Sequence, residues 1–176
     1  MNIQLRTVVL LAVTLVVLFL LGEINHYLAA WHVQLYLGGL LLTFPLLRLR
    51  FKQGLVFVSA LGFFHDAVTA FPFGASLVAF LIAHTVVYSL RSHFHREAPT
   101  SGLAVAFVLN GTLILAFALI WMPDHTHKAL YWQRILVDAM FSQLAVFFIA
   151  GWFFMLQNEA LRFFGIFLDQ EQRQAE

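Results

Sequence analysis

The sequence predicts an all-α integral membrane protein, a polytopic bundle of six transmembrane helices with both termini in the cytoplasm. Hydrophobic residues make up 61% of its 176 residues, charged residues make up 11%, and the mean hydropathy is +0.84. This composition excludes a soluble domain of this size. Apolar runs of transmembrane length recur along the chain, and the alternation typical of a membrane barrel is absent. Lys and Arg are distributed unevenly around those runs.

Six apolar runs are separated by short polar or turn-forming breaks. The second run is short and contains Gly38, Gly39 and Pro45, which predicts a kink or a tilt. Pro72 follows the third run and Pro123 closes the fifth. We expect one transmembrane domain over residues 1–176, with a cytoplasmic tail at 157–176. The expected spans are about 7–27, 33–47, 54–71, 74–92, 101–122 and 132–156.

The basic residues orient these spans. Eight of the ten Lys and Arg fall on one side of the six-span arrangement, and only Lys128 and Arg134 fall on the other. The eight are Arg6, Arg48, Arg50, Lys52, Arg91, Arg96, Arg162 and Arg173. The positive-inside rule therefore places both termini in the cytoplasm. A cleaved signal peptide ending near Leu28–Ala30 is a competing interpretation, but the first apolar run exceeds the ~7–15 residues of a signal-peptide core.

The predicted tail carries an apolar cluster, which includes Phe163, Phe164 and residues 166–168, between Arg162 and Asp169. This pattern is typical of a helix lying in the cytoplasmic membrane interface. It is equally compatible with a sixth helix that simply runs on.

Few polar side chains lie inside the predicted spans, and each is costly there unless it has a partner or a function. They are Glu23, His65, Asp66, His84, Asn110 and Asp138. The topology places Glu23, Asp66 and Asp138 in the outer half of the bilayer and His84 nearer its middle. A partner or ligand pocket is therefore expected among Glu23, His65, His84, Asn110 and Asp138.

The sequence argues against catalysis and metal binding. It contains no cysteine, no GxSxG or HExxH motif and no acid pair on one helix face, so neither an activated nucleophile nor a metal triad is indicated. The His-x-His pairs at 93/95 and 125/127 are interpreted as solvated loop residues. We expect no enzyme activity, no cofactor, no metal and no nucleic-acid partner. Proton or solute transport through His65 and Asp66 is an alternative.

Asp66 ends a stripe of small residues. Gly54, Val58, Gly62 and Asp66 recur every four residues and therefore share one helix face. The next helix begins just beyond, near Gly74, with free N–H groups that a carboxylate can accept. We expect Asp66 to close this turn as a structural acceptor, with an Asn at this position keeping most of the function. A partner, ligand or proton role is the alternative.

The run Gly62-x-x-x-Asp66-x-x-Thr69, followed by Pro72 and Gly74, resembles the segment typical of the bacterial rod shape-determining MreD family. Chain length, the short proline-bearing second span with its basic exit, and the long sixth span with a charged tail are also similar. The sequence departs from that pattern at Val58 and Ala70, where the family favours Gly, and at His65, which is not a usual neighbour of the acid.

The resemblance implies a non-enzymatic scaffold subunit of the elongation (rod) complex in the bacterial cytoplasmic (inner) membrane, supporting lateral peptidoglycan synthesis and cell shape. The implied partners are MreC, a single-span protein with a periplasmic coiled coil, the glycosyltransferase RodA with its transpeptidase, and MreB filaments. The lipid bilayer is the remaining partner. Aromatic residues of the last span, Phe141, Phe147, Phe148, Trp152, Phe153 and Phe154, would pack a partner helix or face lipid.

A second hypothesis is a small-molecule-binding subunit that resembles the substrate-capture components of energy-coupling transporters, which are also compact six-helix proteins. Ligand capture predicts an outer-leaflet cavity lined by Glu23, Asp66 and Asp138. A scaffold predicts that these groups are bonded to the chain's own backbone.

Overall fold

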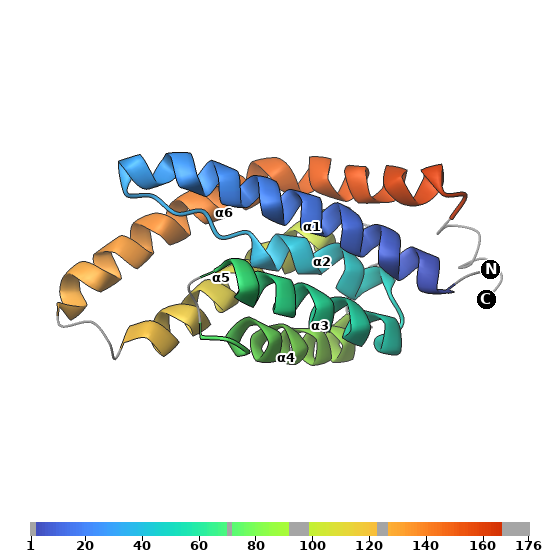
Figure 1. Ribbon diagram of the computed structural model, residues 1–176, viewed down its shortest axis with the longest axis horizontal. Helices are drawn as coiled ribbons and strands as arrows, with labels where there is room; N and C mark the ends of the chain where they lie inside the picture. Colours follow the sequence, from blue (N-terminus) through green and yellow to red (C-terminus); the bar gives the residue numbers. More distant parts are fainter. Residues whose placement is uncertain (1–2, 70–71, 92–98, 123–126, 167–176) are drawn as a thin grey trace.

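The computed structural model describes residues 3–69, 72–91, 99–122 and 127–166. Their regular secondary structure is helical, and they contain no strand (Figure 1). The long helices α1, α5 and α6 are apolar enough to cross a membrane, so the predicted all-α membrane class is confirmed at this level. The elements are α1 (Ile3–Leu28), a 3-10 turn η1 (Ala29–Trp31), α2 (Gly38–Arg48), α3 (Phe51–Val68), α4 (Ala75–Leu90), α5 (Pro99–Trp121) and α6 (Lys128–Phe163).

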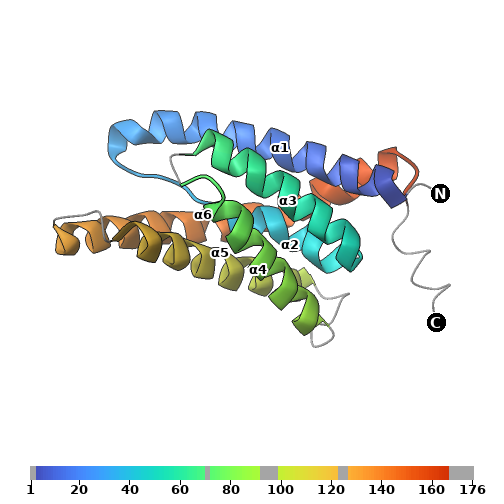
Figure 2. The same ribbon diagram turned by 60° about the horizontal axis from the view of Figure 1, so that its bottom comes forward.

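Helix α2 forms the centre of the bundle. Nine of its eleven residues, from Gly38 to Leu46, are buried, and the other helices surround it (Figure 2). A helix that is apolar on all sides is stable only when it is covered on all sides. Its eleven residues extend only about 16 Å, well short of the ~30 Å hydrocarbon core.

The second predicted span, 33–47, is wrong at its start. Residues 33–37 are not helical, and α2 begins only at Gly38. The third helix likewise ends at Val68 rather than at 71, because the backbone is already extended at Thr69. Residues 70 and 71 lie outside the described part of the chain.

The predicted cytoplasmic tail also needs correction, because residues 157–163 continue α6. Gln157 and Leu161 are fully buried, and Gln157 Nε2 donates to Thr14 Oγ1 of α1 at 3.1 Å. Packing against α1 therefore extends the helix to Phe163. There Gly165 turns the chain with a positive φ of 71°, and the Ile166 N–H donates to the Leu161 carbonyl at 3.0 Å. Residues 167–176 lie outside the described part.

Small residues allow close helix contacts where the sequence predicted them. Gly54, Val58, Gly62 and Asp66 are all buried on the face of α3 that packs on α4. A methyl group at Gly62 would lie 2.7 Å from the Leu77 Cα. Only a glycine therefore permits this approach of the two backbones.

Candidate functional site

Asp66 caps the start of α4. Its Oδ2 accepts the Gly74 N–H at 2.9 Å and the Leu77 N–H at 3.3 Å, while Oδ1 accepts the Ser76 N–H at 2.9 Å. The acceptor role expected from the sequence is present in this geometry. Gly74 brings its N–H to the Asp66 carboxylate by adopting a left-handed φ of 94°, a conformation that favours glycine.

The other motif residues stabilise the same turn. The Thr69 hydroxyl donates to the His65 carbonyl at 2.7 Å, and the Pro72 carbonyl accepts the Ala75 N–H at 3.0 Å. His65 is buried, and its Nδ1 shares a 2.8 Å hydrogen bond with Ser76 Oγ. Residues Gly62, Asp66, Thr69, Pro72 and Gly74 thus form one connected corner between α3 and α4.

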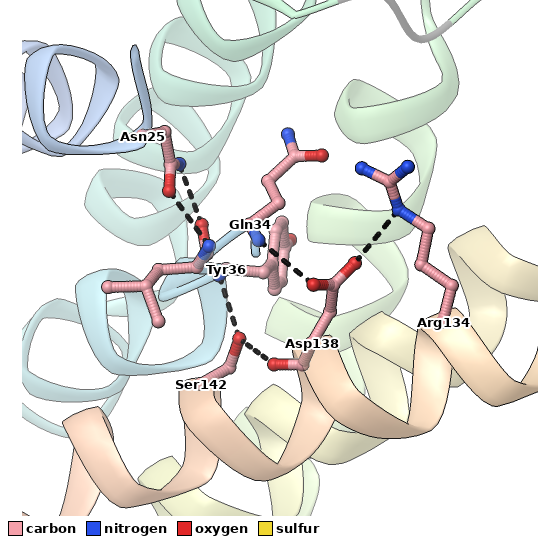
Figure 3. Close-up of polar contacts among 7 residues, drawn as sticks. Asn25, Gln34, Tyr36, Arg134, Asp138 and Ser142 are labelled. Atoms are coloured by element: carbon pink, nitrogen blue, oxygen red, sulfur yellow. Dashed lines mark hydrogen bonds and ion pairs between the residues drawn. The ribbon is translucent and has the colours of Figure 1, made fainter. Parts of the chain in front are cut away.

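A second polar cluster holds the extended segment 33–37, which enters the bundle between α1 and α6 (Figure 3). The Asn25 amide accepts the Leu35 N–H at 2.8 Å and donates to the Leu35 carbonyl at 2.8 Å. Asp138 Oδ1 accepts the Gln34 N–H at 2.9 Å. These side chains take the place of helical partners for the backbone, which is why the segment need not be helical.

Tyr36 is bonded on both sides of its backbone. Its N–H donates to Ser142 Oγ at 2.9 Å, and its carbonyl accepts from Asn110 Nδ2 at 2.9 Å. The Asn110 Oδ1 also accepts the Gly39 N–H at 3.0 Å, which fixes the first turn of α2. Asn110 therefore orders the chain between the extended segment and α2 instead of facing a pocket.

A cavity of about 900 Å³ lies against this segment, between α1 and α3 on one side and α5 and α6 on the other. In both ribbon views the α5–α6 hairpin diverges from the C-terminal end of α1, and the extended segment lies between them (Figures 1 and 2). Glu23, His65, Thr69, Arg134 and Asp138 line the cavity. Most of the remaining wall consists of apolar side chains of these four helices.

The predicted pocket is therefore only partly assembled. Glu23, His65 and Asp138 share the cavity, but His84 and Asn110 do not, and including them was wrong. His84 faces the beginning of α3 instead, where its Nε2 donates to the Phe51 carbonyl at 3.0 Å and its ring stacks on Phe51. It fills the space left by Gly54, where a methyl group would lie 2.2 Å from its ring.

No family model, curated protein or solved structure matches this chain.

Sequence reasoning missed Asn25, Tyr36, Arg134 and Ser142. Asn25 and Arg134 were near the ends of apolar runs, where a polar residue is ordinary, and Tyr36 and Ser142 are common inside membrane helices. Their significance depends on the nonhelical segment, to which Asn25 and Ser142 bond directly. The one available signal is an Asn two residues after an acid, Glu23, at the end of a span.

Charge at the mouth of the cavity is only partly balanced. Arg134 Nε lies 3.8 Å from Asp138 Oδ2, a long ion pair in which the Arg134 side chain is 58% exposed. Glu23 is exposed and forms no hydrogen bond or ion pair with the described residues. No group of three or more potential metal ligands occurs within the described ranges.

Proposed function

We propose that this chain is a non-enzymatic membrane scaffold subunit of the bacterial elongation complex. The proposal rests on what the polar side chains inside the predicted spans bond to. Asp66 and Asp138 bond the chain's own backbone, as a scaffold predicts, and so does Asn110. Glu23 is the exception, because it makes no hydrogen bond with the described residues. The resemblance of residues 62–74 to the MreD family supplies the biological assignment, with an MreC-like protein, RodA with its transpeptidase, and MreB filaments as partners.

We place the chain in the bacterial inner membrane with six spans and cytoplasmic termini. Clustering of the basic residues supports this topology. Arg6 donates to the Arg48 carbonyl at 2.7 Å, and Arg91 donates to the Leu49 carbonyl at 3.4 Å. Three of the predicted cytoplasmic arginines therefore meet at one end of the bundle, where cytoplasmic loops carry an excess of positive charge.

The exposed face of α6 is the surface we propose for the MreC-like partner. Phe141, Phe147, Phe148 and Trp152 are 49–76% exposed, whereas Phe153 is fully buried and serves the core. Large rigid aromatic side chains give contact area at low entropic cost. Lipid contact is the competing role of this face.

Co-purification tests the proposal. The chain is co-expressed with the MreC-like protein of its own genome and captured by a tag on either subunit. Capture is expected for the wild type and reduced for Phe148→Ala, because that aromatic ring projects from the proposed interface. Phe107→Ala removes an equally apolar exposed ring from α5 and is the control. Wild-type protein that fails to capture the partner, in cells that keep normal shape when the gene is removed, would contradict the scaffold function.

The cavity favours a second candidate function, small-molecule capture. Its volume is within the roughly 300–1,000 Å³ of typical ligand pockets. This function predicts co-purification with an ATPase pair in place of an MreC-like protein.

A further inference from the structure

Three side chains that line the cavity are also exposed on the outside of the bundle. They are Phe19 of α1 and Phe64 and Val68 of α3, which are 50–68% exposed. In a membrane protein such side chains face hydrocarbon. The cavity wall at these three side chains is therefore continuous with the surface that faces hydrocarbon, in the outer leaflet under the proposed topology.

The deep wall suits a hydrocarbon chain. Leu18, Leu41 and Phe117 line the cavity and are buried in the core, with exposed fractions of 8%, 1% and 3%. Gly22 widens the space, because a methyl group built on it would meet no atom within 4 Å. Acyl chains bind such walls through burial of apolar area.

The mouth suits a head group that carries both charges. Arg134 is largely exposed and only loosely paired with Asp138, which is already committed to the Gln34 N–H. Glu23 has no partner among the described residues. An acidic group without a partner selects a cation that can donate hydrogen bonds, and an exposed guanidinium selects a phosphate.

We infer that this cavity binds a phospholipid with a primary ammonium head group, such as phosphatidylethanolamine, taken laterally from the outer leaflet. Glu23 receives the ammonium, Arg134 contacts the phosphate, and one acyl chain lies along the wall formed by Leu18, Leu41 and Phe117. A quaternary ammonium cannot donate a hydrogen bond to Glu23, and a glycerol head group carries no cation, so choline and glycerol lipids bind more weakly. The inference rests on the proposed topology, which places the cavity in the outer leaflet, but not on the scaffold function.

Tryptophan quenching in vesicles tests the inference. Trp121 lines the cavity, whereas Trp152 is exposed on α6 away from it. Two variants keep one of these tryptophans each and have the other three of the four replaced by Phe. They are reconstituted in phosphatidylcholine vesicles that contain a minor fraction of phosphatidylethanolamine with brominated acyl chains. Trp121 is expected to be quenched well beyond Trp152, which reports random contact with the bilayer.

Selectivity and site are tested in the same vesicles. Brominated phosphatidylglycerol or phosphatidylcholine should quench the two tryptophans equally. Glu23→Gln should weaken binding of the ethanolamine lipid by roughly tenfold, as expected for one lost charge-assisted hydrogen bond. Gly22→Phe, which fills the cavity, should abolish the excess quenching of Trp121. Gly151→Phe is the matched control, because Gly151 is also an open, exposed helix position but does not line the cavity.

Several results would overturn the inference. Equal quenching of Trp121 and Trp152 would show that no lipid is held. Preference for the glycerol lipid, or wild-type quenching in Glu23→Gln, would refute the head-group assignment. Complete displacement by water-soluble phosphoethanolamine would show that the free head group, and not the lipid, is the ligand. Unchanged quenching in Gly22→Phe together with lost capture of an MreC-like protein would assign the cavity to a partner.

Discussion

Asn25 and Leu35 are joined by two hydrogen bonds, one from the Leu35 N–H to Asn25 Oδ1 and one from Asn25 Nδ2 to the Leu35 carbonyl, both 2.8 Å long. The side-chain amide pairs with the backbone as a neighbouring strand would. This pairing lets the chain run extended from α1 into the bundle and reach the buried start of α2.

Asn25→Ala removes both partners of the Leu35 backbone. We expect it to lower the free energy of unfolding by about 2–6 kcal/mol, because each of the two partly buried backbone groups left unpaired costs about 1–3 kcal/mol. Thermal unfolding in detergent measures the change. Asn158→Ala is the control, since Asn158 lies on α6 and makes no hydrogen bond with the described residues. Equal melting of the two variants would refute the role of Asn25.

Asp66→Asn is expected to be intermediate rather than nearly silent. Both carboxylate oxygens accept backbone N–H groups, and an amide keeps only one acceptor and turns an NH₂ group toward a donor. This geometry revises the sequence-based expectation for Asn. We expect a loss of about 1–3 kcal/mol for Asp66→Asn and a larger loss for Asp66→Leu. The yield of folded protein by size-exclusion chromatography ranks the variants. A wild-type yield of Asp66→Leu would contradict the role of Asp66 as the cap of α4.

Gly62→Ala tests the contact between α3 and α4. The added methyl group would press on the Leu77 backbone, which cannot turn aside as a side chain can, so a loss of about 1–3 kcal/mol is expected. Gly22→Ala is the matched control in open space. It should be neutral or stabilising by up to about 1 kcal/mol through helix propensity. If both variants melt alike, the close approach at Gly62 is not important for stability.

Tyr36→Phe should stabilise the protein. The Tyr36 hydroxyl is buried beside Gly38 and has no hydrogen-bond partner among the described residues, so its removal relieves a desolvation cost of about 1–3 kcal/mol. The ring itself keeps its contacts with His65 and Phe117. Tyr131→Phe is the opposite case, because that hydroxyl donates to the Ala118 carbonyl at 2.6 Å, and it should destabilise. The midpoints of thermal unfolding should therefore move in opposite directions.

Cysteine labelling tests the topology. The chain has no cysteine, so single substitutions give an unambiguous signal. A membrane-impermeant maleimide should label Lys128→Cys in intact spheroplasts and Glu159→Cys only after permeabilisation, because the two lie at opposite ends of α6. A reporter fused after Glu176 should be active only as a cytoplasmic fusion. Labelling of Glu159→Cys in intact spheroplasts would refute the orientation.

The sequence alone determined that the chain belongs in a membrane, that its fold is helical, and that Asp66 closes the turn between α3 and α4. These properties depend on composition and on spacings within a few residues, so local physics decides them: apolar runs must be helical in lipid, and a carboxylate eight residues before Gly74 can reach the free N–H groups there. Helices α1 and α5 and the α3–α4 corner accordingly lie close to their predicted positions.

Tertiary structure decided that segment 33–37 is extended, how long α6 is, and which residues line the cavity. Residue 34 is bonded to Asp138, 104 positions away, and Gln157 to Thr14, 143 positions away. Such distant pairings leave no periodic signal in one sequence. Asn110 and Asp138 look alike as isolated polar residues in apolar runs, yet Asn110 faces α2 and Asp138 faces the cavity, because helix rotation is set by the packing of all neighbours together.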